Sequence, residues 1–303
     1  MRNSTVPTLT GSRRMRRKSP AWHSLSVFMR VMLHNRQAFF GMIILLGFLF
    51  MATAGPSLIA LDGRGDFASR FAPISARHPL GTDNVGRDLF SQLVHGSRDV
   101  LFIGAVAACF TVLIGFTVGA VAGFAGGAVD SMLMAVTNLF LTIPYFPVMI
   151  VLTAIIKGSS NIILAIMVAS FGWAGLARAI RAQILSMKQR DYIVVCKTMD
   201  MGYAHIVFKE MLPNLTSYLA INFIGSMQGA INASSGLILL GFAPYKTTHW
   251  MAMLNSAIIA CSGTLQPKML LFLFVPIVAF GLLQMGCIFF AHGLDEAMNP
   301  RLR

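Results

Sequence analysis

The amino-acid sequence predicts an all-α membrane protein with about six transmembrane helices. Of its 303 residues, 56% are hydrophobic and 12% are charged, about half the charged fraction of a typical soluble domain. Apolar runs long enough to cross a hydrocarbon core of roughly 30 Å recur six times along the chain. Lysine and arginine gather in segments beside these runs. Together, these observations indicate a multi-pass helical protein.

The six predicted spans follow a basic N-terminal segment, residues 1–38. The first span could be read as a signal peptide, because small residues end it at Ala52-Thr53-Ala54, but 38 preceding residues exceed what a signal peptide normally carries, so we interpret it as an uncleaved span. A short polar linker at 157–161 separates two runs, which makes five or seven spans the alternatives. The predicted spans are 39–61, 100–124, 131–156, 161–178, 215–242 and 268–291.

The positive charges predict the orientation of these spans, because short loops rich in lysine and arginine stay in the cytoplasm. Residues 1–38 hold eight of them and no acid, residues 178–209 hold six, and the tail 292–303 holds two, which makes 16 of 24. Both termini and the loop 179–213 are therefore predicted to be cytoplasmic, and the segment 62–99 to be extracytoplasmic. Topology also accounts for the net charge of +13, so nucleic-acid binding is not inferred.

Several kinds of chemistry find no support in the sequence. The four cysteines lack metal-ligand spacing, so we expect no metal site. The stretch "GTDNVGRD" has phosphate-loop glycine spacing, but Arg87-Asp88 stand where Lys and Ser/Thr must contact phosphate and magnesium. We expect no bound cofactor and no ATP hydrolysis on this chain. The predicted spans hold almost no ionisable residues, which disfavours an ion-coupled carrier.

Small and neutral polar residues lie within the predicted spans. Gly115, Gly119 and Gly123 repeat at the interval that lets two helices approach closely, and we interpret them as packing residues. A polar stripe on the fifth span must avoid lipid, so its members either bond to other helices or line a water-filled path. Two polar residues of the third span, just before Pro144 and Pro147, form a second candidate with a kinked backbone. The translocation-path candidates are Gln228, Asn232, Ser235, Asn138 and Thr142.

The charged stretch from Arg178 to Asn214 separates two long apolar runs. It is predicted to form a helix, a break at Gly202, a second short helix and a stop at Pro213. The short helix, Tyr203–Leu212, would carry an apolar ridge flanked by charge, which is typical of a helix that sits in a groove on a partner. The ridge consists of His205, Phe208 and Met211/Leu212, with Lys209 and Glu210 beside it.

Three motifs carry a resemblance to a known family. "HPLGTDNVGRDLFSQLVHGSRDVLFIG" (78–104), "LGFAPYKTTHWMAMLNSA" (240–257) and "HGLDEAMNPRLR" (292–303) are similar to segments of the C-type permeases of dipeptide/oligopeptide/nickel ABC importers. The likeness runs in order from about residue 36 to the end. It implies a type I ABC importer permease fold in the bacterial inner membrane. It also implies a second permease, two ATP-binding subunits that carry ATP and magnesium, and an extracytoplasmic substrate-binding protein.

The first motif joins Gly81-Thr82-Asp83 to Gly86-Arg87-Asp88. From the residues alone, Asp83 is predicted to cap the following helix, whose Leu89, Leu93 and Ser97 would lie along the membrane surface. This interfacial helix would be either structural or involved in receiving substrate.

The resemblance identifies the charged stretch with the family's EAA loop, whose short helix inserts into an ATP-binding subunit. The positions usually filled by Glu-Ala-Ala are here Val194-Val195-Cys196, and the usual glycine is Asp200, with Gly202 two residues later. A glycine displaced by two residues would rotate the second helix by about 200°. Alternatively, Asp200 itself adopts the left-handed turn.

The sequence thus predicts an ABC importer permease that ATP-driven movement of partner subunits pushes between inward and outward access. Di- and oligopeptides are the expected substrates, with nickel chelates, glutathione and oligosaccharides as alternatives. A secondary carrier and a non-transporting assembly subunit are the other classes considered.

Overall fold

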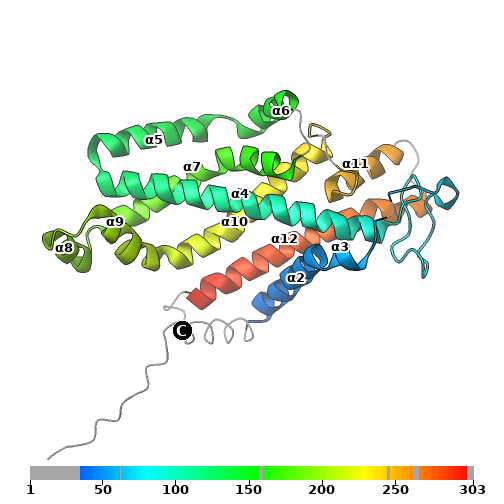
Figure 1. The fold of residues 1–303 in the computed structure, drawn as a ribbon, viewed down its shortest axis with the longest axis horizontal. Helices are drawn as coiled ribbons and strands as arrows, with labels where there is room; N and C mark the ends of the chain where they lie inside the picture. The colour runs from blue at the N-terminus through cyan, green and yellow to red at the C-terminus, as the bar shows by residue number, and fades with distance from the viewer. Residues whose placement is uncertain (1–34, 62, 157–159, 244–245, 262–265, 299–303) are drawn as a thin grey trace, which may run out of the picture.

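A computed structural model describes residues 35–61, 63–156, 160–243, 246–261 and 266–298, and within them the fold is helical without strands (Figure 1). Most of the basic N-terminal segment and the last tail residues lie outside the described part. The long helices are α2 (Arg36–Thr53), α4 (Leu89–Ala125), α5 (Gly127–Thr142), α6 (Tyr145–Ile155), α7 (Asn161–Met187), α10 (Leu212–Leu239), α11 (Trp250–Ala260) and α12 (Leu270–Met298). The short ones are α3 (Gly55–Leu58), η1 (Phe67–Ser69), α8 (Asp191–Thr198), α9 (Tyr203–His205), η2 (Ile206–Met211) and η3 (Pro267–Met269).

Four of the described helices are long and apolar enough to cross a membrane: α2, α4, α7 and the segment Pro267–Ala297. The count becomes five if α5 and α6 together form one broken span. The predicted fifth span, 215–242, corresponds to α10, whose 28 residues would reach about 42 Å, but its sequence is too polar to meet the same apolar standard.

The third predicted span, 131–156, is not one continuous helix. It is divided into α5 and α6, which meet at an angle of 83°. Ile143 has an extended backbone, with φ −70° and ψ 126°, at the boundary. The following Pro144 disfavours helical geometry at that position. The proline pair therefore causes a sharp break where the sequence predicted a kink.

The predicted interfacial helix after residue 88 is wrong as a separate element. Residues 89–99 are the first turns of α4, which runs unbroken for 37 residues. Leu89 and Ser97 are fully buried in protein and do not lie along a membrane surface. The indole Nε1 of Trp250 donates to the Leu93 carbonyl oxygen at 2.9 Å, which holds this part of α4 against the start of α11.

The predicted glycine interface joins α4 to α7. A Cβ atom at Gly119 would lie 2.5 Å from the Ala177 carbonyl oxygen, and one at Gly123 would lie 2.9 Å from Ile184 Cβ. Gly115 faces Leu176 in the same way. These close approaches confirm the packing interpretation, because larger side chains would force the two helices apart.

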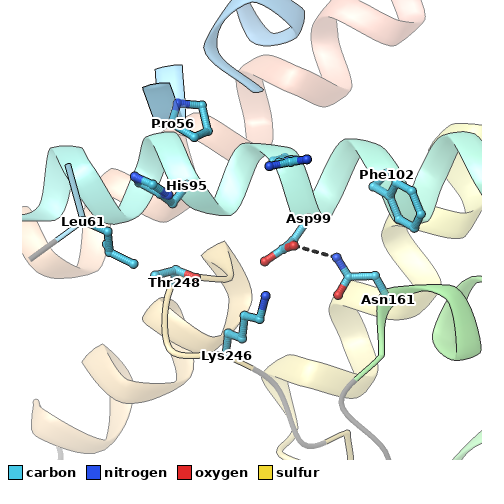
Figure 2. A pocket seen from close by; sticks show the side chains of 9 residues that line it. Pro56, Leu61, His95, Asp99, Phe102, Asn161, Lys246 and Thr248 are labelled. Carbon is cyan, nitrogen blue, oxygen red and sulfur yellow. Dashed lines mark hydrogen bonds between the residues drawn. The ribbon is translucent and has the colours of Figure 1, made fainter. Parts of the chain in front are cut away.

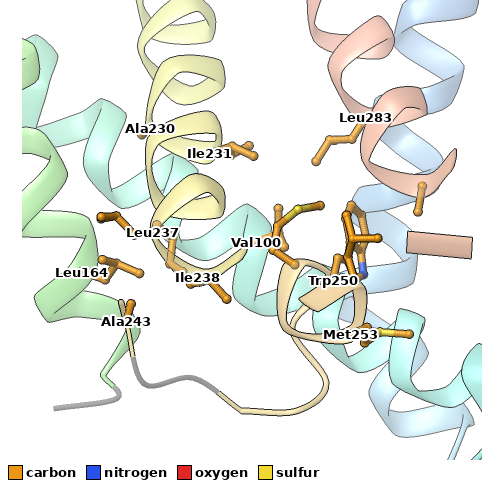
Figure 3. Close-up of a cluster of buried hydrophobic side chains, with 14 of the residues drawn as sticks. Val100, Leu164, Ala230, Ile231, Leu237, Ile238, Ala243, Trp250, Met253 and Leu283 are labelled. Atoms are coloured by element: carbon orange, nitrogen blue, oxygen red, sulfur yellow. The ribbon is translucent and has the colours of Figure 1, made fainter. Parts of the chain in front are cut away.

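The main hydrophobic core lies where α4, α7, α10, α11 and α12 meet (Figure 3). Trp250 is a fully buried member of this core, and its ring lies 5.4 Å from that of Phe48 on α2. A second cluster, built around Phe116, Ile180 and Ile206, occupies the other end of α4. The two clusters fix both ends of α4, one near its first turns and one beside α8–η2.

The first turn of α2 and the last turns of α12 lie together, because the Asn35 side-chain amide donates to the Glu296 carboxylate. Both lie toward the same end of the molecule as α8 and α9 (Figure 1). This arrangement agrees with the predicted topology, in which both termini and the charged loop lie on one side of the membrane.

Candidate functional site

The candidate site is the coupling segment, residues 188–213, which contains α8, α9 and η2 at one end of the molecule (Figure 1). Asp200 between α8 and α9 has φ 54°, the left-handed conformation, whereas Gly202 has φ −58°. Of the two alternatives for the glycine position, the structure therefore has Asp200 making the turn. Its amide donates to the Lys197 carbonyl oxygen at 3.0 Å, and that of Met201 donates to the Cys196 carbonyl oxygen at 3.1 Å.

Pro213 does not stop the short helix, so that prediction is wrong. Helical turns continue from Tyr203 through the π-helical η2 into α10, where Pro213 is the second residue. Proline has no amide hydrogen to donate and crowds the preceding turn. The wider π-helical turn just before Pro213 accommodates this defect.

The coupling segment has one buried side and one exposed side. Ile193, Ile206 and Met211 are buried against the spans. Of the predicted coupling residues, His205, Cys196, Glu210 and Leu212 are half-buried, whereas Lys209, Pro213, Asp200 and Gly202 are exposed. Large apolar side chains are also exposed: Val194 (49%), Val195 (55%), Met199 (64%), Tyr203 (77%) and Phe208 (59%).

Phe208 also contacts the chain's own spans. Its ring centroid lies 6.2 Å from that of Phe116 on α4, and both rings line an apolar cavity of about 380 Å³. One side of the Phe208 ring therefore packs against this chain, and the other side is exposed.

Phe124, near the end of α4, joins the coupling segment to the spans. The ring of Tyr203 packs edge-to-face on it at 5.2 Å, and the ammonium groups of Lys188 and Lys197 lie 5.6 Å and 5.5 Å from its centroid. Lys188 also donates to the Phe124 carbonyl oxygen at 2.9 Å. Burial, followed by the charge of Lys197, lowers the pKa of Lys188. We call these four residues the Phe124 joint; sequence reasoning missed it because its members come from separate elements.

A second link ties α5 to α7. Arg181 donates through Nε and Nη2 to both carboxylate oxygens of Asp130, at 2.5 and 2.6 Å. One turn away, Arg178 Nη2 donates to the predicted path residue Asn138 at 2.8 Å. The start of α5 is therefore held to α7 close to the coupling segment.

The first motif forms a folded loop at the opposite end of the molecule. Fully buried Asp83 accepts from the backbone amides of Val85 and Arg87 at 2.9 Å, and from the side chains of Arg87 and Gln92 at 2.8 and 3.0 Å. Asp83 does not cap α4 as predicted. Asp88 does so, accepting from the Ser91 amide at 2.7 Å.

Glycines and further contacts complete this loop. Gly81 and Gly86 have φ 78° and 82°, and a Cβ at Gly86 would lie 1.8 Å from the Asp66 carbonyl oxygen. The Thr82 hydroxyl donates to the Ser69 carbonyl oxygen, and Arg87 Nη1 donates to Thr247 Oγ1 at 3.0 Å. The motif thus joins the segment after α3 to the loop before α11.

The predicted polar stripe on α10 is not gathered on one cavity. Asn232 accepts a hydrogen bond from Gln284 Nε2 on α12 at 2.7 Å. Ser235 is buried, and its hydroxyl has no hydrogen-bond partner within the described residues, whereas Gln228 is half-buried. The Thr142 hydroxyl donates to the Leu139 carbonyl oxygen of its own helix.

A cavity of about 360 Å³ lies on a different face of α10, between α5, α6 and α7. Its lining includes Thr111, Tyr145, Phe171, Ser226 and Gly229. Sequence reasoning missed these residues, because single polar side chains on separate helices form no pattern.

These features define a multi-helix membrane protein with an exposed apolar surface on the short helices at one end. The chain belongs to the family described as binding-protein-dependent transport system inner membrane component, which matches residues 115–303. It is a multi-pass inner-membrane permease subunit of an ABC importer. The resemblance drawn from the three motifs is thereby confirmed.

Relatives extend the similarity to almost the whole chain. The dipeptide transport system permease protein DppC of Bacillus subtilis (strain 168) is 34% identical over 274 residues, covering 89% of this chain and 83% of the relative. The oligopeptide transport system permease protein OppC of the same organism is 30% identical over 288 residues, covering 92% of each. A protein of the same name from Mycobacterium bovis is 33% identical over 219 residues, covering 72% of this chain and 75% of the relative.

Proposed function

We propose that this chain forms half of the translocation path of an ATP-driven importer of di- or oligopeptides. The names of its relatives, which describe dipeptide and oligopeptide permeases, support this substrate class. Its partners are a second permease, two ATP-binding subunits and an extracytoplasmic binding protein that delivers the peptide. ATP and magnesium bind to the ATP-binding subunits, and this chain holds neither.

The exposed apolar side of the coupling segment is the observation that carries the proposal. Met199, Tyr203 and Phe208 are each more than half exposed, although charged residues surround them. Apolar side chains gathered on an exposed helical surface are typical of a helix that sits in a groove on a partner. An ATP-binding subunit would cover this side, while Ile193, Ile206 and Met211 anchor the other side to the spans.

The coupling segment would transmit movement through the contacts that hold it. When the ATP-binding subunits close, the segment moves with them and pulls on α4 through the Phe124 joint. The pair Asp130–Arg181 passes the displacement of α7 to α5. Because a sharp bend separates α5 from α6, a shift of α5 together with α7 relative to α6 and α10 would change the cavity that these helices line.

The translocation path would combine this cavity with part of the predicted polar stripe. Thr111 and Ser226 line the cavity, and Gln228 is half-buried on another face of α10. Neutral polar groups suit a peptide, because they form hydrogen bonds with its amides without binding positively or negatively charged peptides preferentially.

Purification of the tagged full-length chain from its native membrane tests the proposal. A second permease and ATP-binding subunits should be retained, and ATP hydrolysis in proteoliposomes should rise when the binding protein is loaded with a dipeptide. Uptake driven by an ion gradient without ATP-binding subunits would instead identify a secondary carrier. Retention of the partners without dipeptide stimulation would leave the importer class intact and remove the peptide assignment.

A further inference from the structure

A polar pocket of about 370 Å³ lies beside the first half of α4 (Figure 2). The coupling segment lies at the other end of that helix (Figure 1). Its lining includes the polar residues His95, Arg98, Asp99, Asn161, Lys246 and Thr248. None of them belongs to the coupling segment or to the proposed path. The pocket therefore needs an explanation of its own.

The charges in this pocket match a zwitterion. Arg98 and Lys246 are exposed, and within the described residues neither side chain forms an ion pair or a hydrogen bond. Asp99 is 9% exposed and accepts from Asn161 Nδ2 at 2.5 Å, and Figure 2 shows Lys246 directed toward these two residues. Two cations can hold an anionic group, while the single carboxylate attracts an ammonium group.

The pocket continues into an apolar groove of about 650 Å³ between α2, α4 and α10. Pro56, Arg98 and Phe102 line both the polar pocket and this groove, so the two are contiguous. The groove beyond them is lined mainly by apolar side chains, including Leu49 and Ala105. Leu49 and Phe102 are 52% and 44% exposed, so the groove is open along the outside of the helices.

The position of Arg98 along α4 corresponds to a membrane surface. Arg98 and the last residue of the helix, Ala125, are 27 residues apart, which gives about 40 Å along the axis. A bilayer including its headgroup regions is about 40–45 Å thick. With the coupling end of α4 at one surface, Arg98 lies at headgroup level on the other, and the groove extends toward the hydrocarbon core.

We propose that the polar pocket and the apolar groove bind one phospholipid of the phosphoethanolamine class. Its phosphate lies between Arg98 and Lys246, its ammonium group lies toward Asp99, and an acyl chain occupies the groove. A short peptide carries the same two charges, but it would leave the long groove empty. This site is independent of the substrate that the permease transports.

Lipid binding to the complete complex tests the proposal. The complex is delipidated in detergent and titrated with phosphatidylethanolamine, and bound lipid is quantified by mass spectrometry. The variant R98Q/K246Q should lose roughly tenfold or more in affinity, because it removes two charge-assisted contacts. The matched variant R77Q/K268Q, which alters exposed cations outside both cavities, should bind like the unmodified complex. Ala105→Phe should also weaken binding by filling the groove.

Several outcomes would overturn the proposal. Equal lipid affinity in R98Q/K246Q and the unmodified complex would do so, as would equal losses in R98Q/K246Q and R77Q/K268Q. Displacement of the lipid by a dipeptide would make the pocket a substrate site, and displacement by glycerophosphoethanolamine would make it a site for the free headgroup. If R98Q/K246Q fails to assemble, the charge-conserving R98K/K246R should retain binding while Ala105→Phe loses it, and any other pattern contradicts the proposal.

Discussion

Replacement of Phe124 by leucine should loosen the coupling segment from the spans. The change keeps an apolar side chain but removes the ring that contacts Tyr203, Lys188 and Lys197. Each cation–π contact contributes about 0.5–1 kcal/mol, and an edge-to-face ring pair contributes about 0.5–1.5 kcal/mol. The hydrogen bond from Lys188 to the carbonyl oxygen of residue 124 remains. Attachment of the segment should therefore weaken by about 2–3 kcal/mol.

Hydrogen–deuterium exchange of the purified complex measures this loss. Lowering the free energy of local opening by that amount accelerates amide exchange about 30- to 150-fold. The increase should be confined to α8, α9 and η2. Phe110→Leu is the control, because Phe110 is an exposed ring on α4 with no aromatic contact within the described residues. Unchanged protection of the segment in Phe124→Leu, or an equal increase in Phe110→Leu, would refute the role of the joint.

Three further predictions follow from topology, polar contacts and burial. With Cys196 replaced, Gln189→Cys should react with a membrane-impermeant thiol reagent only in inverted vesicles and Asn84→Cys only in spheroplasts; labelling of Gln189→Cys from outside would contradict the orientation. Gln228→Leu should alter transport while assembly stays intact. Asn232→Leu should lower the melting temperature, because it removes the hydrogen-bond partner of the half-buried Gln284 amide on α12; identical assembly failure of both variants would favour packing. Burial lowers the pKa of His249 to about 3, so below about pH 6.5 the unfolded chain binds more protons than the folded chain, and stability decreases as the pH is lowered. On acidification the melting temperature should therefore fall less in His249→Asn than in the unmodified protein; parallel pH profiles would contradict this.

Composition was sufficient to predict a helical membrane protein, but hydropathy could not locate the helix ends. Hydropathy reports which residues suit lipid, and the first turns of α4 are polar because they pack against the loop that contains Thr248. Hydropathy also does not identify α10 as an apolar span, because this helix is long but contains many polar residues. The bend after α5 was foreseeable from Pro144, whereas its angle depends on packing.

The sequence predicted the position of the coupling segment in the chain, but not its backbone geometry or its contacts. The sequence left two positions for the turn, and only backbone geometry shows that Asp200 adopts the left-handed conformation. The Phe124 joint brings together residues from the end of α4, the end of α7, α8 and α9. Such a cluster has no periodicity or local spacing that a sequence pattern could reveal.

Whether an ATP-binding subunit sits on the exposed side of the coupling segment is the central question. Phe208→Ala and Phe116→Ala answer it as a pair, because both remove the internal ring contact at 6.2 Å but only Phe208 is on the exposed side of the segment. Loss of one large apolar anchor at an interface commonly costs about 2–4 kcal/mol, or roughly 30- to 1000-fold in affinity. ATP-binding subunits retained on the affinity-purified complex should therefore fall in Phe208→Ala and remain in Phe116→Ala, while the second permease stays bound to both. Full retention with coupled transport in Phe208→Ala, or equal loss in both variants, would contradict docking on this side.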